Sequence, residues 1–76
     1  MPKLPVVNGR EAAQAFRRDG FVVDHQTGGH LILWHPEKRV SIPVPLHGGR
    51  DLKPGTLRRL IRDAGLTIEE FRQLLE

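Results

Sequence analysis

The sequence of 76 residues predicts an α+β fold in which helices cover one face of a three-stranded antiparallel sheet. Three runs of strand-forming residues follow one another in the middle of the chain, separated by turn signals, which predicts an antiparallel meander. Amphipathic segments with capping signals precede and follow these runs. Helical amphipathicity accounts for only one covered face, so the other face of the sheet is expected to stay open.

The first helix is expected from about Gly9 to Asp19. The stretch from Asn8 to Glu11 has the spacing of a capping box, in which the two side chains satisfy backbone donors at a helix start. Gly20 follows as a natural left-handed cap. The helix carries a narrow apolar stripe made of Ala12, Ala13, Ala15 and Phe16.

Residues 21–26 form the first predicted strand, and Thr27-Gly28-Gly29 is the turn into the second. The apolar run His30–Trp34 predicts a central strand that is buried on both faces. Residues 40–44 alternate like a half-buried strand, and Pro43 places this strand at an edge because proline cannot donate to a ladder. Alternation leaves two candidates for the open face, either His30, Ile32 and Trp34 or Leu31, Leu33 and His35.

Two further helices are expected after the sheet. Pro54 suits the first turn of one helix, and Gly65 ends it. Thr67 and Glu70 have the spacing of a second capping box, which begins a short last helix. The apolar sides of the two helices consist of Leu57, Leu60, Ile61 and Ala64, and of Ile68, Phe71, Leu74 and Leu75.

Composition narrows the class of protein. Lys and Arg number 12 against 9 Asp and Glu, and the resulting formal charge of +3 favours a polyanionic partner. There is no cysteine, so disulfides and thiolate metal sites are excluded. Without a signal peptide or a stretch long enough to span a bilayer, residues 1–76 are expected to form one domain of a soluble, cytoplasmic protein.

Four histidines are the candidates for proton transfer near neutral pH, namely His25, His30, His35 and His47. The first three are five residues apart, so neighbours on one strand would face opposite ways, and no metal site is expected from them. His30 and His47 each adjoin glycines, and two histidines with cations could cleave RNA without metal. From spacing alone, the reading that each is a surface histidine without a role remains open.

The loop from Gly48 to Thr56 offers bare backbone amides, Arg50, Lys53 and a helix N-terminus, which together could bind a phosphate. It lacks the GxxxxGKS/T pattern, and a purely structural loop would look similar. Trp34 could stack on a base or belong to the core. The arginines of the second helix, Arg58, Arg59 and Arg62, form either a basic stripe or an ordinary solvated face.

The run from Val44 to Phe71 closely resembles the second half of the HicA toxin family. Gly28-Gly29-His30 and Gly20-Phe21 are similar to the Gly-Ser-His motif and the Gly-Phe pair that the family carries earlier in its chain. The resemblance extends from about Asn8 to Leu75. It implies a fold like that of double-stranded-RNA-binding domains, ribosome-independent cleavage of mRNA, no cofactor, and control by a HicB-like antitoxin protein.

By this resemblance His30 would be the catalytic residue and His47 a possible helper. Gly28, Gly29, Arg50 and Lys53 are the candidates for contacting RNA and its phosphates. Two departures from the family pattern stand out. Gly29 replaces the family serine, and His25 and Thr27 occupy positions where the family often has basic residues.

Two other functions fit the same residues. A non-catalytic RNA-binding module would use the basic surface and would bind RNA in a salt-sensitive way without cutting it. A protein-interaction domain would dock an antitoxin on the open sheet face and would have no affinity for RNA.

Overall fold

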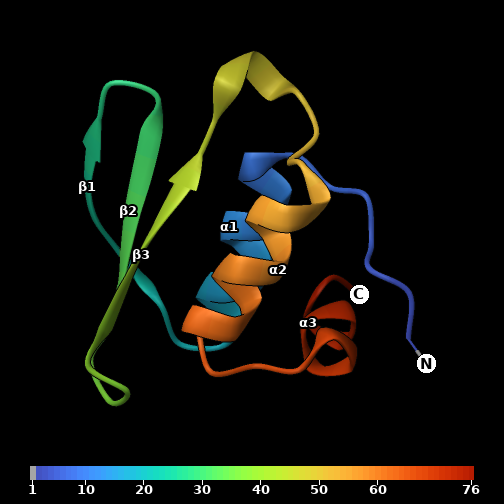
Figure 1. Cartoon of the computed structure of the whole chain (residues 1–76). Helices are drawn as coiled ribbons and strands as arrows, with labels where there is room; N and C mark the ends of the chain where they lie inside the picture. The colour runs from blue at the N-terminus through green and yellow to red at the C-terminus, as the bar shows by residue number, and fades with distance from the viewer. Residues whose placement is uncertain (1) are drawn as a thin grey trace.

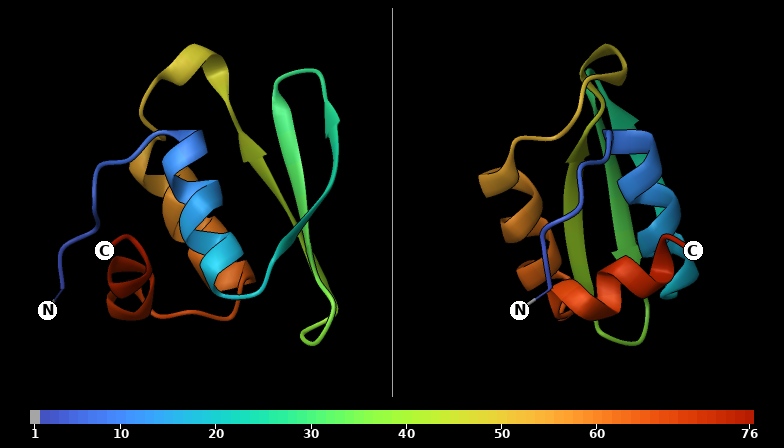
Figure 2. Two further views of the ribbon diagram at one scale, coloured as in Figure 1. Left: turned by 180° about the vertical axis from the view of Figure 1, so that it is seen from behind. Right: turned by 90° about the vertical axis from the view of Figure 1, so that its right-hand side faces the viewer.

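The computed structural model describes residues 2–76, so Met1 lies outside the described residues. Helices α1 and α2 pack side by side on one face of the sheet, and the short helix α3 crosses their ends (Figures 1 and 2). The elements are α1 (Gly9–Arg18), β1 (Val22–Thr27), β2 (His30–His35), β3 (Val40–Pro45), the 3-10 turn η1 (His47–Gly49), α2 (Pro54–Asp63) and α3 (Ile68–Leu74). This order confirms the predicted α+β fold and its resemblance to double-stranded-RNA-binding domains.

Both predicted capping boxes are present. At the start of α1, the Asn8 side chain accepts the Glu11 N–H at 2.8 Å, and the Glu11 carboxylate accepts the Asn8 N–H at 2.9 Å. At the start of α3, Thr67 and Glu70 exchange the same two bonds at 3.0 and 2.8 Å. Each box satisfies two backbone donors that a helix start otherwise leaves unpaired. No helix within residues 2–76 has the length and apolarity needed to cross a membrane.

The sheet has the order β1-β2-β3 and is antiparallel throughout, so the predicted meander and the edge position of β3 are confirmed. Leu33 and His35 of β2 are buried under the helices. His30, Ile32 and Trp34 therefore lie on the open face. The expectation that β2 is buried on both faces is wrong, because the helices cover only one face and these three side chains stay half-buried.

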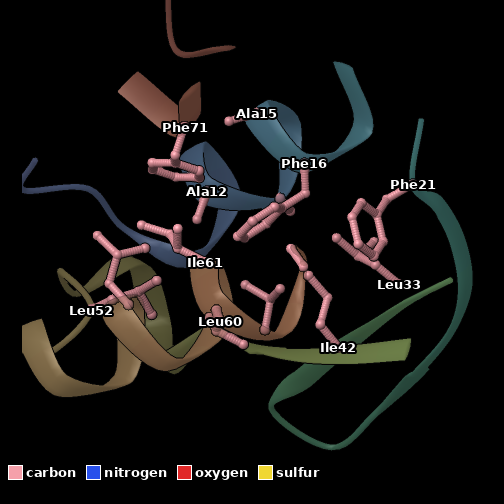
Figure 3. Packing of buried hydrophobic residues seen from close by; sticks show 14 of the residues in the cluster. Ala12, Ala15, Phe16, Phe21, Leu33, Ile42, Leu52, Leu60, Ile61 and Phe71 are labelled. Carbon is pink, nitrogen blue, oxygen red and sulfur yellow. The ribbon is translucent and has the colours of Figure 1, made fainter. Parts of the chain in front are cut away.

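The core lies between the sheet and the helices and is centred on Phe16 of α1. The Phe16 ring lies 5.0 Å from that of Phe71 and 5.7 Å from that of Phe21, measured between centroids. Leu33 and Ile42 reach this cluster from the sheet (Figure 3). Trp34 does not belong to it, so the alternative that placed Trp34 in the core is wrong.

His35 has a structural role. It is the one buried polar side chain in the described part of the chain, with 3% of its surface exposed. Its Nδ1 accepts the Lys38 N–H at 3.1 Å, so Nε2 carries the proton and donates it to the Asp19 carbonyl at 3.0 Å. Gly20, at a φ of 115°, packs directly against the ring, where a Cβ would come within 2.8 Å of Nε2. The ring thus joins the end of α1 to the turn after β2.

The start of α1 abuts the end of β3. A Cβ on Gly9 would collide with the backbone carbonyl of Pro45, so only glycine permits this approach. Beside it, Asn8 pairs with Asp51, and the Leu52 N–H donates to the Val7 carbonyl at 2.8 Å. The segment before α1 is thereby attached to the loop that follows β3.

Replacing Gly9 with alanine should destabilise the fold, because the new methyl group meets backbone that cannot rotate away. The expected loss is about 1–3 kcal/mol in the free energy of unfolding, the usual cost of overpacking. Gly55→Ala is the matched control, since a Cβ there meets no atom within 4 Å and alanine favours a helix. Equal stability of both variants in urea titrations would contradict the close contact.

The capping box of α3 should make stability depend on pH. The N–H of Thr67, followed by its hydroxyl, lowers the pKa of Glu70 below its ordinary 4.5 by stabilising the carboxylate. A lowered folded-state pKa means that this contribution is full above pH 4.5 and is lost as the pH falls through the folded-state value. Urea titrations of wild type and Glu70→Ala should therefore differ at pH 7 and converge as the pH falls below 4.5. A constant difference would show that the carboxylate charge is irrelevant.

Candidate active site

His30 and His47 face each other at the surface. Their ring centroids are 6.0 Å apart, and the ring planes meet at 74°. His30 begins β2 directly opposite Pro45 of β3, and His47 follows Pro45 by two residues. The strand register therefore brings the two rings to the same end of the sheet, as a pair of side chains able to reach one ligand.

The glycine turn before His30 is tied to the loop that carries His47. The Leu46 N–H donates to the Gly29 carbonyl at 2.7 Å, which extends the ladder beyond the end of β3. Gly28 has a φ of 50°, a conformation that glycine adopts without strain. An added Cβ on Gly28 or Gly29 would meet no atom within 4 Å. The backbone beside His30 is accordingly open, and a serine at Gly29 would fit.

His47 lies in a strained backbone segment. Its φ is 36°, and Gly48 and Gly49 follow at 61° and 85°. Only glycine enters this region readily, so the histidine carries a local cost that its surroundings must offset. Such strain is typical of positions where a side chain is held for a function.

The two histidines border hollows in which Arg50, Lys53 and Arg59 outnumber the carboxylates Asp51 and Asp63. One hollow of about 350 Å³ is lined by His47, Arg50 and Lys53, and a second of about 740 Å³ by His30, Lys53 and Arg59. Pro45, Lys53 and Thr56 line both, so the two hollows adjoin; together we call them the histidine groove. Lys53 lines both the hollow that contains His30 and the hollow that contains His47, whereas Arg50 lines only the hollow of His47.

The N-terminus of α2 opens onto this groove. The helix begins at Pro54, its N-cap residue Lys53 makes no side-chain capping bond, and its first turn contains no acidic residue. The backbone N–H groups of Gly55 and Thr56 are thus at the positive end of a helix without a compensating carboxylate. With Lys53 beside them, they form an arrangement that favours an anion such as phosphate.

The other two histidines lie elsewhere. His25 is on the exposed strand β1, where its Nδ1 is 2.7 Å from the Asp24 carboxylate, and His35 is buried. Within residues 2–76, no three His, Asp or Glu side chains come together as metal ligands would.

The structure adds residues that the sequence did not single out as a set. One stripe of α2 lines the larger hollow, and it consists of Thr56, Arg59, Leu60 and Asp63. These positions have the spacing i, i+3, i+4 and i+7, which places them on one helix face. The spacing of these polar residues along the helix is the signal that the sequence offers for this stripe.

Fold and site together define a small α+β protein with two facing histidines in a cation-lined groove. A family model described as "HicA toxin of bacterial toxin-antitoxin" matches residues 9–66. The chain therefore belongs to the HicA toxin family, which confirms the resemblance found in the sequence. It is the toxin of a toxin-antitoxin system, and the family implies an antitoxin partner. A comparison with curated proteins gave no significant match.

The strain at His47 can be measured by comparing two truncations. His47→Gly and His47→Ala both remove the imidazole, but only glycine relieves the positive φ. We expect His47→Gly to be more stable than His47→Ala by about 1 kcal/mol, the cost of a non-glycine residue in the left-handed region. Chemical unfolding of both variants tests this. A more stable alanine variant would mean that the loop relaxes at no cost.

Proposed function

We propose that this toxin is an endoribonuclease that cleaves mRNA independently of the ribosome and without a metal ion, with His30 as general acid or base. The observation that carries the proposal is the pairing of His30 with His47, whose ring centroids are 6.0 Å apart. Both rings adjoin Lys53 and the uncapped start of α2. Two groups able to transfer protons thus flank a position suited to a phosphate.

The reaction follows from this pairing. One histidine takes the proton of a ribose 2′-OH, and the 2′-oxygen attacks the adjacent phosphorus. The bond from phosphorus to the 5′-oxygen breaks, and the other histidine gives that oxygen a proton. The products are a 2′,3′-cyclic phosphate and a free 5′-OH. No electron transfer or added reactant is needed.

The cations stabilise the charge that grows on the phosphate in the transition state. Lys53 lies where both hollows meet, and Arg50 adds a second positive charge on the His47 side. The N–H groups at the start of α2 add neutral donors. Gly28 and Gly29 leave the backbone beside His30 open, so an RNA strand can approach the ring closely.

A HicB-like antitoxin is the expected regulator in the cytoplasm. The groove lies at the surface, so a protein that covers His30 and His47 would block access of RNA. A carboxylate from that partner would complement Lys53 and Arg50.

The test is cleavage of an end-labelled single-stranded RNA by purified protein in EDTA. Wild type should cut, and His30→Ala should cut 10²- to 10⁴-fold more slowly, the usual contribution of a general acid or base. His47→Ala should also be slower. His25→Ala is the matched control, because His25 is exposed on β1 and lines neither hollow of the groove, so its loss should leave the rate unchanged.

The outcomes separate the competing functions once circular dichroism shows that all variants fold. Loss of cleavage in EDTA that returns with a divalent metal would contradict the metal-free reaction. A 2′-deoxyribose at the cut site should abolish cleavage, and continued cutting there would contradict attack by the 2′-OH. If wild type binds RNA but does not cut it, the RNA-binding module is favoured. If wild type does not bind RNA at all, the protein-interaction domain is favoured.

A further inference from the structure

The larger hollow has two walls of different chemistry. Pro43 and Pro45 of β3 supply apolar rings, and Leu60 of α2 completes this apolar surface. Arg59 and Asp63 add one positive and one negative group from the same helix face. A wall of this kind suits a flat, partly polar ring better than it suits a phosphate.

Asp63 is the informative residue. It is the last residue of α2, at the negative end of the helix, where a carboxylate is unfavourable. Within residues 2–76, its ion-pair contact is the Nε of Arg62 at 3.8 Å, between side chains that are 78% and 47% exposed, and such a pair contributes little. Asp63 therefore has no structural partner that explains its position.

Asp63 is the one carboxylate on the larger hollow among the described residues. The other ionisable groups on the same hollow are His30, Lys53 and Arg59, all of which are cations when protonated. A carboxylate among them repels an RNA backbone. It favours binding where the bound molecule presents hydrogen-bond donors, and in RNA those donors belong to the bases and the ribose hydroxyls.

Guanine matches the pair of Arg59 and Asp63. Its Watson–Crick edge presents N1–H and the 2-amino group side by side, which a carboxylate can accept together, while its O6 and N7 accept from arginine. Arg59 and Asp63 are one helical turn apart and therefore neighbours. No ion pair within 4.0 Å joins them in the described part of the chain, so both can engage a base.

The dimensions also fit. A hollow of about 740 Å³ is large enough for one nucleotide. Asp63 lies two turns of helix beyond Thr56, about 10 Å along the axis from the phosphate-binding end. A base next to the scissile phosphate would reach it.

We propose that the larger hollow binds a guanine next to the scissile phosphate, with Asp63 and Arg59 reading its edge. The position relative to cleavage rests on the proposed ribonuclease function. Recognition of the base does not, because it can be measured by binding to protein that cannot cut.

The experiment measures binding of short uridine oligonucleotides, each with one guanosine, inosine or adenosine, to the His30→Ala variant by fluorescence anisotropy. The guanosine oligonucleotide should bind about five- to hundredfold more tightly than the adenosine one, the range that one bidentate base contact gives. Inosine, which lacks the 2-amino group, should bind with intermediate affinity. When Asp63→Asn is combined with His30→Ala, the preference for guanosine over adenosine should fall at least fivefold.

Glu69→Gln is the matched control, since it removes the same charge from α3 and should leave the preference unchanged. Equal binding of the three oligonucleotides would overturn the inference, whether or not wild type cuts RNA. If the variant prefers guanosine but wild type does not cut RNA, the ribonuclease proposal is overturned and the recognition of guanine stands. Asp63→Asn should also be at least as stable as its parent in urea, and a marked loss of stability would assign Asp63 a structural role and overturn the inference.

Discussion

The arrangement of the site depends on a backbone contact between Gly9, at the start of α1, and the carbonyl of Pro45, at the end of β3. No side chain fits between them, so α1 can lie close against the strand. The neighbouring pair of Asn8 and Asp51 holds the far end of the loop that follows β3. His47 is inside that loop and is thus positioned from both sides.

The second constraint is the register of the sheet. Pro45 lies opposite His30, and the bond from Leu46 to the Gly29 carbonyl continues the ladder by one step. A shift of one residue would send His30 to the helix side of the sheet. The buried positions prevent this shift, because Leu33 and Ile42 pair beneath the helices. The core therefore determines which face of the sheet carries the histidine, and so links packing to the site.

Local patterns predicted the elements well because their causes are local. The capping boxes at Asn8 and Thr67, the glycine after α1 and Pro54 at the start of α2 each act within one turn of chain. The pairing of His30 with His47 could not be deduced from spacing, because it depends on the strand register and on positive φ angles at His47, Gly48 and Gly49. The error at β2 has the same origin. An apolar run such as Ile32 to Trp34 indicates a strand, but which face the helices cover is decided by tertiary packing.

Departures from the usual rules of helix stability are most marked in α2, which borders the groove. Helices α1 and α3 have capping boxes, acidic first turns and basic last turns, all of which favour the helix, although the C-cap residue of α1 is Asp19. Helix α2 has neither a capping side chain nor an acidic first turn, and it ends in Asp63. The strained φ of His47 lies in the loop just before it. Helix α2 thus departs from these rules at both of its ends, and residues at both ends line the groove. These departures reduce stability there, and the simplest physical reason is that this surface binds a ligand. An uncapped helix start favours an anion, and a carboxylate at the helix end favours a hydrogen-bond donor. A nucleotide supplies both.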